Sequence, residues 1–204
     1  MVIMKTERIL DCTFNELAVC GIKHASVDNI AAKMHVSKKT IYDLFENKEK
    51  LLLSSIKWKI GKVIEGFSAS PEKGDNVLGI MIYNAVHLYK FFNSLSPLFW
   101  QERGVMSSVG QYLEEVKEQL LEAGKKRFEE GKCAGFLRMD ANFTIVGRLL
   151  ESQVMAMREE MGREHSSVSI CFYSLVIILR GVCTQKGFAL LENMVNDGFE
   201  EVIE

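Results

Sequence analysis

Residues 35–49 read HVSKKTIYDLFENKE, a stretch in which apolar residues recur at helical spacing among polar ones. Ile41 and Phe45 are four positions apart, so both lie on one face of a helix and can point into a core. The outer face and its flanks then carry the polar side chains Lys38, Lys39, Thr40, Tyr42 and Asp43. The spacing therefore predicts a helix of about 38–45 that is anchored on one side and presents a basic, hydroxyl-bearing surface on the other.

The residues before this stretch predict two more short helices. The first covers about 3–20, and Gly21 can supply the positive φ that ends it. Its apolar stripe is Ile9, Leu10, Phe14, Leu17 and Ala18. Ser26 caps the second helix and Ser37 caps the helix of 38–45. The apolar face of the second helix is Val27, Ile30, Ala31 and Met34. Three short helices, the last two joined by a tight turn, are the helix-turn-helix arrangement.

This arrangement and the charge distribution favour a nucleic-acid partner. A major groove admits one α-helix, whose ammonium and hydroxyl groups can reach phosphates and base edges. Ser26 and Ser37 lie at helix N-termini, which favour anions. Residues 1–60 hold 10 Lys/Arg against 7 Asp/Glu, and residues 61–204 hold 15 against 20. A basic module joined to an acidic one suggests a polyanion, although the same residues also fit a solvated helical hairpin with ordinary lysines.

The segment GIKHASVDNIAAKMHVSKKTIYDLFENKEKLL, residues 21–52, resembles the N-terminal signature of the TetR family of transcriptional regulators. The resemblance runs from about Ile9 to Leu53. It includes the S-V-x-x-I-A entry to the second helix, the V-S-x-x-T-I-Y core of the third, Phe45 and the N-K-E that opens the fourth. It implies a homodimer that binds a palindromic double-stranded DNA operator, usually as a repressor released by a small molecule. The odd number of cysteines, without a C-x-x-C pair, predicts reduced cysteines and a cytoplasmic location.

The resemblance also assigns roles to single residues. Ser26 and Tyr42 match phosphate-contact positions, and Lys48 matches a lysine that touches the DNA backbone. Lys38 and Thr40 match the start of the recognition helix, and Lys39 stands at a variable, base-reading position. The predicted DNA-binding set is Ser26, Ser37, Lys38, Lys39, Thr40, Tyr42 and Lys48.

Three residues depart from the family pattern. His35 replaces the usual turn glycine, and we expect the turn to be kept because histidine tolerates positive φ better than most residues. Leu44 stands where an aromatic residue or histidine often adds a phosphate contact. Asp43 brings a negative charge to the outer face, where it pairs with Lys39 at i, i+4 or accepts from a cytosine amine. We favour the pairing.

Beyond residue 47 the sequence predicts helices only. Prolines number 2 and alternating apolar/polar runs are scarce, which favours an all-α chain. The expected helices are 48–68, 75–93, 95–104, 108–130, 140–161, 167–184 and 188–202. We therefore expect a helix-turn-helix DNA-binding domain over 1–47 and a larger helical effector-binding and dimerisation domain over 48–204.

The helices within 140–184 are the predicted dimer interface. The second of them is apolar nearly all round, which indicates burial on more than one side. In the TetR family the corresponding pair docks on its two-fold mate as a four-helix bundle; the alternative is an internal core helix. The interface residues that we predict are Leu149, Val154, Met157, Phe172, Leu175, Val176 and Leu179.

Aromatic residues and methionines are dense in the middle of the chain and could line an apolar effector pocket. Pro97-Leu-Phe-Trp resembles the short sixth helix beside the pocket in the family. The predicted pocket residues are His87, Phe91, Phe92, Phe99, Trp100, Tyr112 and Met155. Each alone fits an ordinary core position as well. We expect an apolar or aromatic, neutral or weakly polar effector.

Other functional classes find no support in the sequence. It has no G-x-S-x-G and no phosphate loop, so we expect no enzymatic activity. The five cysteines form no C-x-x-C pair and the four histidines are far apart, so we expect no metal and no cofactor. The longest apolar stretch, 167–179, is shorter than the roughly 20 residues that cross a bilayer, and the start lacks a signal sequence. Two alternatives remain: a DNA-binding co-regulator without an effector, and a helical ligand-binding protein or enzyme with a vestigial DNA module.

Overall fold

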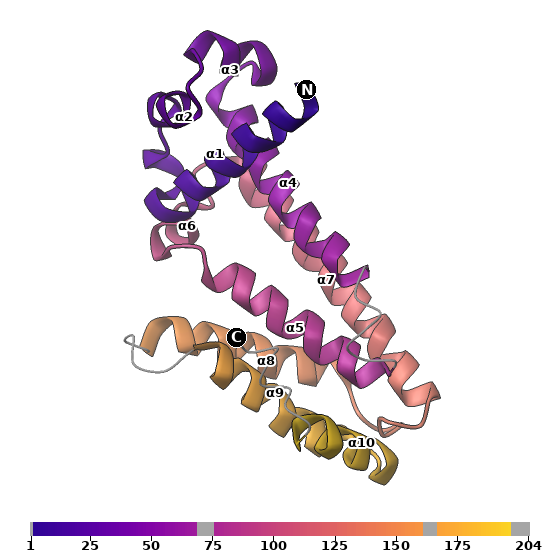
Figure 1. Cartoon of the computed structure of the whole chain (residues 1–204). Coiled ribbons are helices and arrows are strands. Elements are labelled where there is room, and N and C mark those ends of the chain that lie inside the picture. The colour runs from indigo at the N-terminus through magenta and orange to yellow at the C-terminus, as the bar shows by residue number, and fades with distance from the viewer. Residues whose placement is uncertain (1, 69–75, 161–166, 197–204) are drawn as a thin grey trace. The chain divides into compact units, whose positions relative to one another are not determined.

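The computed structural model describes residues 2–68, 76–160 and 167–196, and the regular elements within them are α-helices (Figure 1). Their bounds are α1 Val2–His24, α2 Val27–Met34, α3 Lys38–Phe45, α4 Lys48–Ser68, α5 Val77–Asn93, α6 Pro97–Glu102, α7 Ser107–Cys133, α8 Phe143–Glu160, α9 Ser167–Val182 and α10 Gln185–Asn196. The all-α prediction is confirmed. In these ranges no helix combines the length and the apolar character that spanning a membrane requires.

The turns around α2 and α3 have the predicted chemistry. Ser26 and Ser37 are N-caps, and the Ser37 hydroxyl accepts a hydrogen bond from the Thr40 amide at 3.0 Å. His35 ends α2 in the left-handed region with φ 53°, and its N–H donates to the Ala32 carbonyl at 3.2 Å. Gly21 has φ 82° and kinks α1, which then continues to His24. Histidine therefore adopts the positive φ that this turn requires.

The chain divides into two compact units, Met1–Ala69 with Phe91–Val116 and Ser70–Lys90 with Lys117–Glu204, called the first and second unit below. The first unit extends past the predicted boundary at residue 47 because α4 and α6 both pack on α1. Its core joins the first four helices through Ile9, Leu10, Val27, Ile30, Ala31, Ile41, Phe45 and Leu51. Burial of Ile41 and Phe45 confirms the predicted anchoring face of α3.

The end of α1 is tied to both α4 and α6 through the backbone of Lys23. The carboxylate of Glu102, at the end of α6, accepts from the Lys23 amide at 2.9 Å. The ammonium of Lys48, at the start of α4, donates to the Lys23 carbonyl at 3.0 Å. An added Cβ at Gly21 would lie 2.7 Å from Glu102 Oε2 and 3.1 Å from Leu98 Cβ, and the positive φ of 82° also favours glycine there. The entry to α2 is thus fixed from two sides.

The second unit has a core built mainly from α5 and α9. Four side chains predicted for the dimer interface belong to this core, with exposed fractions of 0–2%: Phe172, Leu175, Val176 and Leu179. These four predictions are corrected, because the chain's own helices cover the side chains and leave no surface for a partner. The prediction that α9 is buried on more than one side is correct.

A tight backbone contact closes the second unit near the start of α10. The carbonyl of Phe136 accepts from the Thr184 amide at 2.9 Å, and Arg138 N–H donates to the Val182 carbonyl at 2.9 Å. A Cβ added to Gly187 would lie 2.0 Å from the Phe136 carbonyl oxygen. Because both partners are backbone, this approach depends on glycine.

Candidate nucleic-acid interface

The outer face of α3 has the exposure that groove binding requires. Lys38, Lys39 and Tyr42 are exposed, and Thr40 is partly buried beside its cap. The hydroxyls of Ser37 and Thr40 lie 2.9 Å apart at the helix N-terminus. Since the first amides of a helix point outward and favour anions, these hydroxyls lie where a phosphate would be bound.

The second helix offers a similar N-terminus. The Ser26 hydroxyl accepts from the Asn29 amide at 3.4 Å. Ser26 is partly buried rather than exposed. Its hydroxyl therefore serves first as a cap, and a phosphate would have to approach it along the helix axis.

The predicted lysines fall into two groups. Lys38 forms an ion pair with Asp28 of α2, and the hydrogen bond to that carboxylate raises the pKa of Lys38. Lys48 donates to the carbonyl of Lys23, yet an ammonium has three donors and keeps two for another acceptor. Lys39 is exposed and, within the described ranges, makes no ion pair or hydrogen bond.

Asp43 does not make the ion pair that the sequence favoured. Lys39 and Asp43 are both exposed, and in the described part of the chain neither has a charged partner. Leu44, beside Asp43, is also exposed. The face therefore carries one unpaired cation and one unpaired anion, four residues apart.

Sequence reasoning missed a buried ionic contact that positions α2. Glu16 of α1 is 5% exposed and accepts from Lys33 Nζ at 2.6 Å and from Asn29 Nδ2 at 3.0 Å. The hydrogen bond from Lys33, followed by that from Asn29, lowers the pKa of Glu16. The ionised carboxylate thus stabilises the fold above the ordinary glutamate pKa, and this stabilisation disappears as the pH falls through the lowered value. The sequence does contain a signal for the burial of Glu16, because Glu16 is seven residues, or two helical turns, after Ile9 and lies on the same apolar face.

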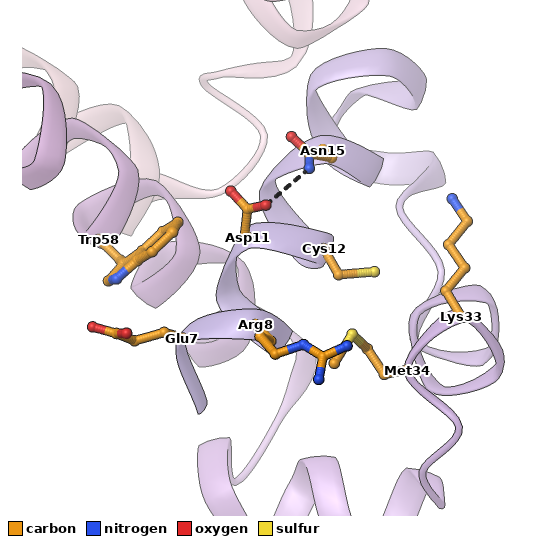
Figure 2. Close-up of a pocket in the computed structure, with 8 residues that line it drawn as sticks. All are labelled: Glu7, Arg8, Asp11, Cys12, Asn15, Lys33, Met34 and Trp58. Atoms are coloured by element: carbon orange, nitrogen blue, oxygen red, sulfur yellow. Dashed lines mark hydrogen bonds between the residues drawn. The ribbon is translucent and has the colours of Figure 1, made fainter. Parts of the chain in front are cut away.

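A shallow groove of about 760 Å³ lies on the first unit between α1, α2 and α4 (Figure 2). Its lining residues are Glu7, Arg8, Asp11, Cys12, Asn15, Lys33, Met34 and Trp58. Its central charges are paired within the chain, Asp11 with Lys59 at 2.9 Å and Lys33 with Glu16. These groups hold the three helices together, and we assign no ligand to the groove.

The exposed apolar residues of α8 and α9 differ from the predicted interface set. Leu149 is 51% exposed, as an interface residue should be, whereas the side chains of Val154 and Met157 lie outside the described part of the structure. Sequence reasoning missed Ile145, Tyr173 and Ile177, which are 60%, 51% and 65% exposed. Each helix thus presents two large apolar side chains at i, i+4, the spacing of one face.

The predicted pocket residues are brought together in part. In the first unit, aromatic rings form a connected series with centroid separations of 5.2–5.7 Å: Phe14, Phe91, Phe92, Trp100 and Phe99. Phe91 and Phe99 are buried, so these two serve the core as well.

The remaining pocket predictions lie apart from this series or cannot be placed. Tyr112 faces Lys57, whose Nζ is 5.1 Å from the ring centroid, and burial raises the pKa of the phenol. His87 belongs to the second unit, where its ring stacks on Tyr83 at 3.8 Å. Its Nδ1 lies 2.9 Å from the Tyr83 carbonyl. The side chain of Met155 is outside the described part. Among the residues with described positions, no three His, Cys, Asp or Glu side chains gather as metal ligands would.

Comparison with known proteins agrees with this geometry. Residues 9–54 match the family model of bacterial regulatory proteins, tetR family. A TetR transcription regulator from Haloarcula marismortui ATCC 43049 has a TM-score of 0.72 at 13% identity, over 89% of this chain and 99% of that one. A TetR-family transcriptional regulator from Cytophaga hutchinsonii has a TM-score of 0.71 at 16% sequence identity, over 89% of this chain and 96% of that one. The fatty acid degradation regulator FadR from Bacillus halodurans has a TM-score of 0.67 at 19% sequence identity, over 87% of this chain and 95% of that one. No curated protein sequence matches.

Proposed function

We propose that this chain, a TetR-family regulator by the match of residues 9–54, is a homodimeric repressor in the cytoplasm. In this proposal two copies of α3 bind a palindromic operator, and a small apolar or aromatic effector releases it. The protein acts by binding alone and is not an enzyme.

The observation that carries the proposal is the two-sided character of α3. Ile41 and Phe45 fix one side in the core, while Lys39 and Tyr42 are exposed on the other. Glu16 of α1 binds Lys33 of α2, and the amide of Lys23 at the end of α1 donates to Glu102 of α6, so α1 is fixed to both neighbouring helices. A reading helix needs such rigid support because its side chains must meet base edges within a few tenths of an ångström.

Replacing Lys48 by alanine tests this surface. The variant should bind operator and random duplex more weakly by the same factor, because a phosphate contact carries no sequence information. The slope of log affinity against log salt should fall by about 1 for each DNA phosphate that the variant no longer neutralises. Titrations of both duplexes at several salt concentrations measure this.

Lys62→Ala is the matched control, since Lys62 lies on the same helix and the substitution removes the same charge. Fourteen residues separate Lys62 from Lys48, which is about 21 Å along a helix. Lys62→Ala should keep the wild-type salt slope. Equal slopes for all three proteins would show that Lys48 touches no phosphate.

A homodimer is supported by the exposed apolar residues of α8 and α9. Ile145 and Leu149 on α8, and Tyr173 and Ile177 on α9, are each more than half exposed. Burial of about four such side chains on each protomer would contribute several kcal/mol. A symmetric dimer presents two reading helices, which matches a palindromic site.

An effector site is supported by the aromatic series of the first unit. Phe14 lies on α1 and stacks on Phe91 at 5.7 Å, so a ligand that displaces the rings would act directly on the helix that holds α2 and α3. The rings favour an apolar or aromatic compound. One protein of similar fold is a fatty acid degradation regulator, which is consistent with an apolar effector.

Titration of the operator complex tests the effector. Compounds found by thermal shift among neutral aromatic and acyl molecules should quench Trp100 fluorescence and lower operator affinity roughly 5–150-fold. Operator DNA must lower the affinity for the compound by the same factor, because coupling between two sites is reciprocal. A tight binder at Trp100 that leaves operator affinity unchanged would contradict the proposed release.

A further inference from the structure

We propose that Asp43 reads a cytosine in the operator and that Lys39 reads a guanine about two base pairs from it. The inference rests on the proposed function, since it assumes that α3 enters a major groove. It assigns a role to a carboxylate that otherwise only weakens attraction to DNA.

The first step is the placement of the two side chains. Lys39 and Asp43 are four residues apart on α3, so they share one face, and both are exposed. The anchoring residues Ile41 and Phe45 are buried on the opposite side. Both charged side chains therefore project from the part of α3 that faces away from the core.

The second step is that neighbouring charges are already engaged. Lys38 pairs with Asp28, and Lys50 pairs with Glu46. Lys39, one turn before Asp43, makes no ion pair with it in the described structure. The Asp43 carboxylate is thus left without a cation from α3 or from the start of α4.

The third step is the chemistry of the groove. A carboxylate brought near phosphates is repelled unless a donor meets it, and an ionised carboxylate only accepts hydrogen bonds. Guanine and thymine show it no donor in the major groove, while cytosine shows the N4 amine. Adenine places the N7 acceptor beside its N6 amine, which repels the second carboxylate oxygen. Cytosine is the base that Asp43 fits.

The fourth step is spacing. Lys39 is a donor only, and guanine offers two adjacent acceptors, N7 and O6. Four residues of helix rise about 6 Å, and stacked bases are about 3.4 Å apart. The two side chains therefore reach bases about two steps apart, one guanine and one cytosine in each half-site.

The test is selection of bound duplexes from a randomised pool by the full-length protein and two variants. Asp43→Ala should lose the preference for cytosine at one position of each half-site, by roughly 5–150-fold. Asp43→Asn should change the preference there to adenine, because an amide pairs with adenine N6 and N7. A structural role of Asp43 would not produce this change of base.

Glu46→Gln is the matched control, since it removes one negative charge at the C-cap of the same helix, and that carboxylate is already paired with Lys50. Its selected sequence should equal that of the wild type. If Asp43→Asn and Asp43→Ala also select the wild-type sequence, the reading role of Asp43 is overturned while DNA binding stands. If the wild type selects no duplex at any salt concentration, the proposed function itself fails.

Discussion

Replacing Ile177 by glutamate is expected to convert the proposed dimer into folded monomers that bind operator about 100-fold more weakly or worse. Ile177 is 65% exposed on α9, so a single chain tolerates the charge. In an apolar interface the same carboxylate would be buried without a partner, at a cost of several kcal/mol. Monomers also lack the linkage of two half-sites, which otherwise raises affinity by about 10²–10⁴. Light scattering and operator titration measure both effects.

Leu175→Glu is the matched control because it places the same charge on the same helix two residues away. Leu175 is 2% exposed and packs in the core of the second unit. This variant should lose helicity and cooperative unfolding, whereas Ile177→Glu should keep both. An Ile177→Glu protein that stays dimeric and binds operator normally would remove this face of α9 from the interface.

Replacing Gly187 by alanine is expected to destabilise the second unit by about 3 kcal/mol or more, through overpacking against rigid backbone. The new Cβ would lie 2.0 Å from the Phe136 carbonyl oxygen, which also accepts from the Thr184 amide. Relief would require α10 to move away from residue 136. For a chain of this size the melting temperature should fall by about 6–12 °C.

Gly61→Ala provides the comparison for this prediction. Gly61 lies inside α4, and a Cβ there meets no atom within 4 Å among the described residues. Alanine should stabilise the helix by up to about 1 kcal/mol. A Gly187→Ala protein that melts at the wild-type temperature would show that the approach to Phe136 is looser than the structure indicates.

The helix-turn-helix could be predicted from sequence because its determinants are local. Ser26 and Ser37 are caps whose partners lie three residues on, and Ile41 and Phe45 define a face by their own spacing. His35 adopts the positive φ that the turn predicts, at 53°. Such features depend on residues that are close in the sequence, so helical periodicity and capping rules predict them.

The exposed face of α9 could not be predicted in the same way. A helix that is apolar nearly all round gives no direction of burial, so sequence cannot tell Leu175 from Ile177. The first is covered by the helices of its own unit and the second is not. Which side is covered depends on packing between elements distant in sequence.

The ion-pair partners of long polar side chains could not be predicted from the sequence either. Glu16 forms an ion pair with Lys33 of α2, and Lys38 forms one with Asp28 of α2 rather than with a residue of α3. The expected pair of Lys39 with Asp43 is absent from the described residues, although its spacing is ideal. Exposed pairs of this kind contribute only about 0.3–0.5 kcal/mol, which is too little to fix a partner from spacing alone.

The backbone of Lys23 links α4 to α6 through two hydrogen bonds. Its N–H, held by Glu102, belongs to the peptide plane before Lys23, and its carbonyl, held by Lys48, belongs to the plane after it. Peptide planes are rigid, so only the two backbone dihedrals of Lys23 lie between them. Sliding of α6 against α4 must therefore turn these dihedrals, rotate the Glu102 or Lys48 side chain, or break one hydrogen bond, and the last has a net cost of about 0.5–3 kcal/mol. That energy is of the size by which an effector and an operator can influence each other.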